Sequence, residues 1–246
     1  MLDADSYHAA LDALDWQIDL GADEAILDAP VNRYETAAAP KAKAAEAPTP
    51  VAAPEPSVEA QKAANAATDL DGLKAALAAF QGFEIRRGAR NLVFSDGDSS
   101  ARVMVIGEVP DRNEDREGKP FTGPAGQLFD RMFAAIDLSR DGGLYATCAL
   151  PWRTPHDRAA TPDELTMMRP FLLRHIELAA PDVLIIMGST PAELLLGRAA
   201  ISRLRGKWTE AAGKPALPML HPAALLKTPE AKRDAWADLL SLKARL

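Results

Sequence analysis

Cysteine is almost absent from this chain of 246 residues, because Cys148 is the one cysteine in the sequence. An intrachain disulfide is therefore excluded, and nothing in the cysteine content indicates an oxidising compartment. No stretch approaches the roughly 18 consecutive apolar residues of a membrane-spanning helix, so no membrane association is expected. The first residues, MLDADSYHAALDALDW, lack a basic segment followed by an apolar core, so no secretory signal is expected either.

The chain also lacks an excess of basic residues, because its formal net charge is −7. The acidity lies on the N-terminal side. Residues 1–67 hold 4 Lys/Arg and 12 Asp/Glu, a net −8, and the remainder holds 24 and 23, a net +1. A near-neutral C-terminal part does not by itself indicate a nucleic-acid partner.

Three regions differ in composition. Residues 1–28 contain an amphipathic pattern from Asp5 to Leu20, which predicts a short helix that either packs on the main domain or binds a partner protein. Residues 29–67 are mainly Ala, Pro, Glu and Lys, which is typical of a flexible, disordered linker. Residues 68–246 carry the apolar runs and amphipathic segments of a folded domain.

Short strands alternate with helices in residues 68–246, which predicts an α/β fold. We expect a three-layer α/β/α arrangement around a central, mostly parallel sheet of four or five strands. The strands are expected at residues 91–94, 102–106, 144–150, 183–187 and 218–220. The clearest helix start is at Thr161, where Pro162 at the first helical position and Glu164 complete a capping box.

The most informative stretch is 101–132, ARVMVIGEVPDRNEDREGKPFTGPAGQLFDRM. An apolar strand delivers a loop rich in carboxylates, including Glu108, Asp111 and Glu114, and Phe121 follows in a segment punctuated by Gly and Pro. The carboxyl end of a buried strand is where ligands bind in open α/β sheets. Any one of these acidic residues, taken alone, equally fits a solvated loop.

This stretch resembles the first motif of the uracil-DNA glycosylase superfamily, nearest the bacterial family 4 pattern GEAPG-x-x-ED-x-x-G-x-PF-x-G-x-AG-x-L-x-D. A second match is LHPAALLK at residues 220–227, which is similar to the late His-Pro motif of the family. The resemblance covers about residues 69–246. It implies a DNA repair enzyme that flips a uracil nucleotide out of the strand and hydrolyses its N-glycosidic bond.

The resemblance also implies the partners and the setting. The substrate is uracil-containing DNA, single or double stranded, and the enzyme is a monofunctional hydrolase, because no lysine is placed by a motif to form a Schiff base. We expect a cytoplasmic, nucleoid-associated monomer with a protein partner reached through the N-terminal helix.

Three residues carry the catalytic roles that the resemblance implies. Glu108 matches the second residue of GEAPG, and it positions or activates the attacking water or stabilises the sugar cation. Asp111 stands where the family has Gly, so this extra carboxylate either takes over water activation or hinders the approach of a phosphate. His221 donates a hydrogen bond to the uracil O2 as negative charge grows there.

Further residues are expected to contact the substrate. Phe121 matches the aromatic residue that stacks on the base, although a core phenylalanine is the simpler alternative outside this motif. Glu114 corresponds to an acid of the base pocket. Gly107, Val109 and Pro110 would shape the backbone around the sugar and phosphate.

Contacts with the DNA backbone are expected from two other places. Leu225 and Leu226 of the late motif would wedge into the space that the flipped base leaves, with ordinary packing as an equal alternative. Lys227 would lie beside a phosphate, and Ser189 would present its backbone N–H to one. Arg153, His156 and Arg158 lie in the loop after the strand that contains Cys148, where they also bear on DNA contact, although a solvent-exposed loop has the same composition.

Two departures from the family pattern concern cysteine. Family 4 holds a [4Fe–4S] cluster on four cysteines, but residues 83–94, FEIRRGARNLVF, lack the early Cys-x-x-Cys pair, and Trp152 and Met168 stand where the later two would be. We therefore predict no cluster, metal or other cofactor, and expect these two side chains to fill that volume. Cys148 stands at the Asn that reads the amide edge of uracil in many members, and a thiol is a weak hydrogen-bond partner.

These departures leave alternatives open. The weak partner at position 148 could extend the activity to other deaminated bases. A catalytically impaired superfamily member that binds or senses DNA lesions is the alternative to an enzyme. A third interpretation makes the N-terminal helix and the linker a tether to a replication or repair protein.

Overall fold

The structure is a computed structural model that describes residues 13, 16, 17 and 56–246. The chain divides into two compact units, residues 1–51 and 52–246, and the second unit contains all the elements considered below. Ala13, Trp16 and Gln17 are helical. The remainder of the expected N-terminal helix, and the expected linker up to residue 55, lie outside the described residues.

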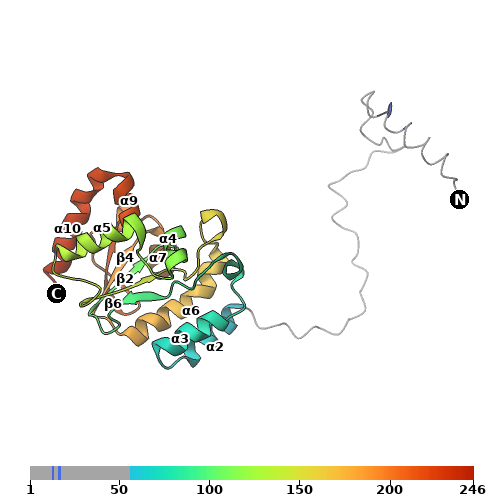
Figure 1. Ribbon diagram of the computed structural model, residues 1–246, viewed down its shortest axis with the longest axis horizontal. Coiled ribbons are helices and arrows are strands. Elements are labelled where there is room, and N and C mark those ends of the chain that lie inside the picture. Colours follow the sequence, from blue (N-terminus) through green and yellow to red (C-terminus); the bar gives the residue numbers. More distant parts are fainter. Residues whose placement is uncertain (1–12, 14–15, 18–55) are drawn as a thin grey trace, which may run out of the picture. The chain divides into compact units, whose positions relative to one another are not determined.

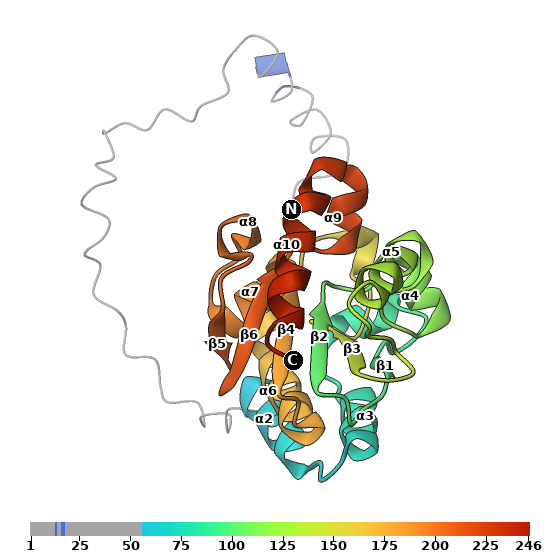
Figure 2. The ribbon, with the colours of Figure 1, turned by 90° about the vertical axis from the view of Figure 1, so that its left-hand side faces the viewer.

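Six strands form one sheet in the order β1-β3-β2-β4-β6-β5 (Figure 2). The four central strands are parallel, and the edge strands are antiparallel to their neighbours. The central strands are β2 (Val103–Gly107), β3 (Leu144–Cys148), β4 (Val183–Met187) and β6 (Lys214–Met219). The predicted α/β class with a mostly parallel sheet is therefore confirmed, with six strands rather than four or five.

Two differences between the expected and the observed strands lie at the edges of the sheet. The strand expected at residues 91–94 is instead β1 (Ser95–Gly97), which pairs with β3. The unexpected strand β5 (Thr209–Ala211) forms a hairpin with β6 through Ala212 and Gly213, whose φ angles are 49° and 72°. Two positive φ values fit a type I′ turn, whereas the three-residue strand TEA is too short and polar to show a pattern.

Helices cover both faces of the sheet (Figure 1). Alternate side chains of each strand point to opposite faces, so β2 contributes Met104 and Ile106 to one core and Val103 and Val105 to the other. The first core is covered by α2 (Pro56–Ala66), α3 (Leu70–Ala79), α6 (Pro162–Ala179) and α7 (Ser189–Leu196). The second core is covered by α5 (Gly123–Ala134), α9 (Pro222–Lys227) and α10 (Lys232–Lys243).

Helix α2 occupies a range that the sequence predicts to be linker. Ala60 and Ala64 are fully buried, and small side chains at these positions let α2 lie close against α6. The Arg174 guanidinium of α6 donates to the carbonyl oxygen of Ala67 at 2.8 and 3.1 Å. Residues 56–67 are thus part of the folded unit.

The remaining helices are single turns or little more. They are η2 (Glu84–Gly88), α4 (Arg112–Glu117), η3 (Pro155–Asp157), α8 (Ile201–Leu204) and η4 (Pro229–Ala231). The capping box predicted at Thr161 is confirmed, because Thr161 accepts from the Glu164 N–H and Glu164 accepts from the Thr161 N–H. Among the residues that the structure describes, no helix is long and apolar enough to cross a membrane.

Candidate active site

The carboxyl ends of the four parallel strands bring most of the predicted site residues to one edge of the sheet. Glu108 follows β2, Cys148 ends β3, Ser189 begins the helix after β4, and His221 follows β6. The chain runs from β2 outward to β3 and then crosses to β4 on the other side of β2. Such a reversal of strand order creates a crevice in which ligands bind in open α/β sheets.

Glu108 is held at the N-terminus of α7. Its carboxylate accepts hydrogen bonds from the backbone N–H of Ser189 and from that of Thr190, the latter at 3.3 and 3.4 Å. The sequence predicts that the Ser189 N–H binds a DNA phosphate; the structure instead directs it to Glu108. The positive end of the helix dipole favours a carboxylate at this position.

Gly188 makes this contact possible. Its φ is 117°, a backbone conformation that favours glycine, and a Cβ there would lie 2.1 Å from Oε1 of Glu108. Any side chain at position 188 would therefore displace the Glu108 carboxylate.

The acidic loop after β2 is the helix α4, whose first turn is closed by a capping box. Oδ1 of Asp111 accepts from the N–H groups of Asn113 and Glu114, at 2.7 and 2.9 Å. Oε2 of Glu114 accepts from the Asp111 N–H at 2.8 Å. Both acids thus have a structural role that a loop interpretation misses, although Asp111 is exposed and its Oδ2 keeps free lone pairs.

Glu114 also fixes the next segment of the site. This side chain is 7% exposed, and its Oε1 accepts from the backbone N–H of Phe121. Burial raises the pKa of Glu114 from 4.5 to about 7, against the opposing effect of the two backbone N–H donors from Asp111 and Phe121. A group with this pKa changes its charge in the neutral pH range.

Phe121 is packed rather than displayed. It is 2% exposed, and its ring stacks on Phe129 at 4.1 Å and on His221 at 5.3 Å between ring centroids. Its φ of 52° lies in the left-handed region, and the backbone passes so close to Gly126 that a Cβ there would lie 1.9 Å from the Phe121 carbonyl oxygen. The structure thus leaves almost none of the Phe121 ring free for a base.

Arg140 is a residue of this site that the sequence patterns do not indicate. Its guanidinium donates to the carbonyl oxygens of Pro120 and Phe121 at 2.8 and 2.6 Å, and pairs with Asp96 at 2.9 Å and Asp130 at 2.8 Å. Together with Glu114, which binds the Phe121 N–H, Arg140 fixes the strained backbone of Phe121 from both sides. Arg140 lies outside both motifs, so no local spacing could have identified it.

His221 is the N-cap residue of α9. Its Nδ1 accepts from the Ala223 N–H at 3.3 Å, so the proton of the neutral ring lies on Nε2. Burial lowers the pKa of His221 to about 4, although the negative charge of Asp111 acts in the opposite direction. At neutral pH this residue is therefore a neutral hydrogen-bond donor through Nε2.

Cys148 lies beside Gly107, because these residues are paired in the register of β2 and β3. The thiol is buried, and its pKa is raised well above the ordinary value, first by burial and then by the nearby charges of Glu114, Asp111 and Glu108. The thiol is therefore protonated and is a weak hydrogen-bond donor. Val109 and Pro110 continue the backbone from Gly107 past this position, with Pro110 buried and Val109 half-buried.

Helix α9 separates the two leucines of the late motif. Leu225 is 1% exposed and packs in the second core, so the prediction that it contacts DNA is not supported by its placement. Leu226 is 42% exposed, and Lys227 is exposed beside it. Helical geometry explains the difference, since consecutive residues point about 100° apart.

The residues at the expected cluster positions do not fit a [4Fe–4S] cluster. Such a cluster needs four thiolate-type ligands, and the chain has a single cysteine, located at the end of β3. Trp152 and Met168 are each 3% exposed in the first core, where the Trp152 ring packs on Phe83 with centroids 5.3 Å apart. Among the described residues, no group of three or more His, Cys, Asp or Glu is arranged to hold a metal ion.

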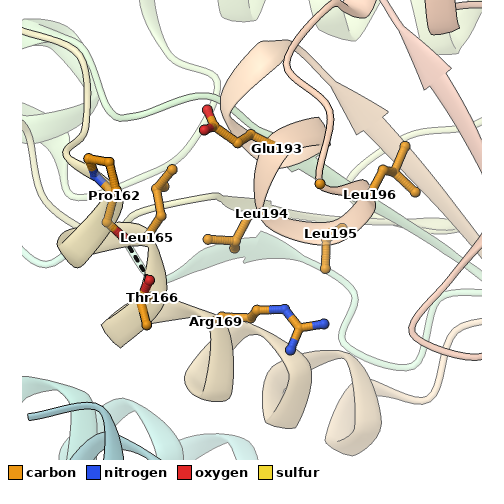
Figure 3. Close-up of a pocket in the computed structure, with 9 residues that line it drawn as sticks. Pro162, Leu165, Thr166, Arg169, Glu193, Leu194, Leu195 and Leu196 are labelled. Carbon is orange, nitrogen blue, oxygen red and sulfur yellow. Dashed lines mark hydrogen bonds between the residues drawn. The ribbon is translucent and has the colours of Figure 1, made fainter. Parts of the chain in front are cut away.

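A cavity of about 490 Å³ between α6 and α7 lies away from these residues (Figure 3). Its walls include Leu165, Arg169, Glu193 and Leu194, and none of the predicted site residues lines it. Its lining contains no group from the carboxyl ends of the strands.

Comparison with known proteins bears on the whole arrangement. A family model described as the uracil DNA glycosylase superfamily matches residues 94–240. The chain is similar to the type-4 uracil-DNA glycosylase of Archaeoglobus fulgidus, with 33% identity over 164 residues that cover 63% of this chain and 82% of the relative. It is similar to those of Saccharolobus solfataricus, with 35% identity over 64% and 77% of the two chains, and Thermotoga maritima, with 30% over 63% and 82%.

Proposed function

Because the chain belongs to the uracil DNA glycosylase superfamily, we propose that it is a DNA repair enzyme that hydrolyses the N-glycosidic bond between uracil and deoxyribose. The observation that supports this best is the convergence of Glu108, Asp111, Cys148 and His221 at the carboxyl ends of the parallel strands. These groups supply a negative charge, a general base and a neutral hydrogen-bond donor around one crevice. Glycosidic cleavage needs all three, because it leaves positive charge on the sugar and negative charge on the departing uracil.

Glu108 stabilises the developing positive charge of the sugar in this proposal. Its carboxylate is fixed by the N–H groups of Ser189 and Thr190, so it need not reorganise when the charge forms. A carboxylate engaged by two donors is better suited to electrostatic stabilisation than to taking a proton.

Asp111 activates the attacking water. Its Oδ1 is engaged by the capping box, whereas Oδ2, which among the described residues accepts only from the Asn113 amide at 3.5 Å, can accept a proton from water. This assignment divides the two roles that the sequence leaves undecided between Glu108 and Asp111.

His221 donates its Nε2–H to a carbonyl oxygen of the base as negative charge grows there. The neutral ring supports this role, because its proton is placed on Nε2 by the Ala223 N–H on Nδ1. The base reaches the face of Phe121 by a shift of the His221 ring, since the two rings are stacked on each other. Side-chain changes of this size are common on binding.

Cys148 extends the range of bases in this proposal. Its neutral thiol cannot replace the two-sided recognition that an amide offers to uracil, so other deaminated bases are excised beside uracil. The enzyme acts as a monomer on DNA of the nucleoid, and residues 1–28 bind a protein partner.

The decisive experiment is an excision assay on labelled uracil-containing single-stranded and double-stranded oligonucleotides. Three variants keep the local hydrogen bonds: Glu108→Gln, Asp111→Asn and His221→Asn. Asn is a good N-cap residue at positions 111 and 221, so α4 and α9 should stay folded. We expect Glu108→Gln and His221→Asn to lose about 10²–10³-fold in rate, and Asp111→Asn about 10²–10⁴-fold.

Thermal unfolding of each variant serves as the folding control. A wild type that binds abasic DNA but releases no base would contradict the enzyme and support a lesion-sensing protein instead. Full activity in Asp111→Asn would indicate that Glu108, rather than Asp111, activates the water. Introducing Cys148→Asn should narrow excision toward uracil if the thiol sets the base range.

A further inference from the structure

A cavity of about 360 Å³, lined by charged residues, lies beside the candidate active site. Its lining residues come from three segments that are distant in the sequence, and all but one are arginines. They are Arg90, Arg112, Asp115, Arg116 and Arg153. We call this the arginine cavity.

The positive charge of the arginine cavity is only partly compensated. Asp115, its one acidic lining residue, is 4% exposed, and its Oδ1 accepts from the backbone N–H groups of Arg90 and Asn91 at 2.8 and 3.3 Å. This carboxylate is therefore hydrogen-bonded to the backbone rather than to a guanidinium. Within residues 56–246, neither Arg90 nor Arg112 forms a side-chain hydrogen bond or ion pair.

The other two arginines have defined partners that leave donors free. Arg153 is oriented by Asp157, which accepts from its Nε and one terminal nitrogen at 2.6 and 2.9 Å. Arg116 contacts Asn113 at 3.4 Å and Glu117 at 3.2 Å through one terminal nitrogen. Each guanidinium has five N–H donors, so both can bind a further acceptor.

Helix α4 connects the arginine cavity to the active site. The N-cap of α4 is Asp111, and Arg112 is the next residue, so their Cα atoms are about 3.8 Å apart. Arg112 and Arg116 are four residues apart and lie on the same face of the helix. A strand bound with one nucleotide at Asp111 would therefore pass the cavity with the next phosphates.

The chemistry of the lining favours phosphate. Arginine forks bind phosphate oxygens in pairs, and clustered guanidinium groups fit a compact, highly charged anion. The net charge of the whole chain is −7, so positive charge must be concentrated locally wherever a polyanion is bound.

We propose that the arginine cavity binds a backbone phosphate of the DNA strand, next to the nucleotide that enters the active site. Arg112 and Arg116 bind its oxygens from α4, and Arg153, held by Asp157, completes the site from the loop after β3. The ligand rests on the proposed function, whereas the cavity and its charge do not.

The test is the salt dependence of DNA binding by the full chain. The probe is a labelled single-stranded oligonucleotide with a tetrahydrofuran abasic analogue, which cannot be cleaved by a glycosylase. The variant Arg112→Ala/Arg116→Ala should lower the slope of log Kd against log[KCl] by about 0.7 for each phosphate contact that is lost. Arg112→Lys should keep the slope but bind less tightly, because it retains charge without the fork.

Arg102→Ala/Lys74→Ala is the control, matched in the number of charges removed. Arg102 is exposed, pairs with Asp182 and precedes β2, at the amino ends of the strands, and Lys74 is exposed on α3. Removing both should leave slope and affinity unchanged. An unchanged slope in Arg112→Ala/Arg116→Ala, with the fold intact by circular dichroism, would overturn the proposal. So would an equal loss in Arg112→Ala/Arg116→Ala and in Arg102→Ala/Lys74→Ala, because the effect would then be one of general charge.

A methylphosphonate scan locates the contact. Neutralising single phosphates one at a time should weaken wild-type binding at one or two positions, and these positions should have no effect in Arg112→Ala/Arg116→Ala. Uracil release, measured in parallel, separates the two proposals. Release by the wild type with a flat scan contradicts the phosphate site alone, whereas a localised scan without release contradicts the glycosylase alone.

Discussion

At the scale of single residues, Glu114 connects the fold of the site to pH. Its folded-state pKa of about 7 exceeds its ordinary value of 4.5, so the folded protein binds more protons than the unfolded chain between these values. The stabilisation is present below pH 4.5 and is lost as the pH rises through 7. Burial lowers the pKa of His175 to about 3 and that of His221 to about 4, so these two groups act in the opposite direction over the same range. We therefore expect the free energy of unfolding of the wild type, taken relative to that of Glu114→Gln, to fall by up to about 3 kcal/mol between pH 4.5 and 7, measured by urea denaturation at several pH values.

Two variants isolate this effect. Glu114→Gln should remove the Glu114 contribution, because its amide does not titrate. Glu117→Gln, in the exposed last turn of the same helix, should retain it and follow the pH profile of the wild type. An identical pH profile in wild type and Glu114→Gln would show that Glu114 does not titrate in this range.

At the scale of elements, the N-terminus of α7 and the end of β2 depend on Gly188. Gly188→Ala places a Cβ 2.1 Å from Oε1 of Glu108 and imposes a positive φ on alanine. We expect a rate loss of about 10²–10³-fold, as for a lost electrostatic group, and destabilisation of about 1–3 kcal/mol. Excision kinetics and thermal unfolding measure the two effects.

Gly197 at the other end of α7 is the control for backbone strain. Its φ is 67°, and a Cβ there would meet no atom within 4 Å. Gly197→Ala should therefore lose stability, by about 1 kcal/mol, but keep its excision rate. Equal rate losses in both variants would mean that strain in α7, not displacement of Glu108, explains Gly188→Ala.

The elements also show where the sequence is informative. Buried strands such as β4 and the capped start of α6 are predicted closely, because apolar runs and capping boxes are local signals. Helix α4 is missed, since its six residues RNEDRE are all polar and its stability comes from caps and from Asp115 reaching the backbone near Arg90. The role of Arg140 depends on contacts with residues 10 to 44 positions away, which a local pattern cannot show.

Within the site, the motif places Glu108, Asp111 and His221 near the strand ends but not their hydrogen bonds. The sequence assigns the Ser189 N–H to phosphate because helix N-termini bind anions. In the structure the anion at this N-terminus is the Glu108 carboxylate. The sequence does not distinguish Leu225 from Leu226. Only the orientation of α9 shows that Leu225 lies in the core and Leu226 is exposed.

At the scale of the whole molecule, the folded unit includes α2. A chain that begins at residue 56 should keep the melting temperature and excision rate of the full chain. A chain that begins at residue 68 loses the buried Ala60 and Ala64 and the Ala67 carbonyl bound by Arg174. We expect a loss of roughly 2 kcal/mol, which corresponds to roughly 4–8 °C, by circular dichroism melting. Equal melting temperatures would show that α2 adds no stability.

The spread of the site over four strand ends has a consequence for synthesis on the ribosome. Glu108 emerges early, but His221 follows β6, which pairs with β4 near the end of the domain. Synthesis proceeds at about 5–20 residues per second, so several seconds separate the synthesis of Glu108 from that of His221. In the proposed mechanism a nascent or prematurely terminated chain therefore cannot excise a base, because the hydrogen-bond donor to the base is missing until the last parallel strand docks.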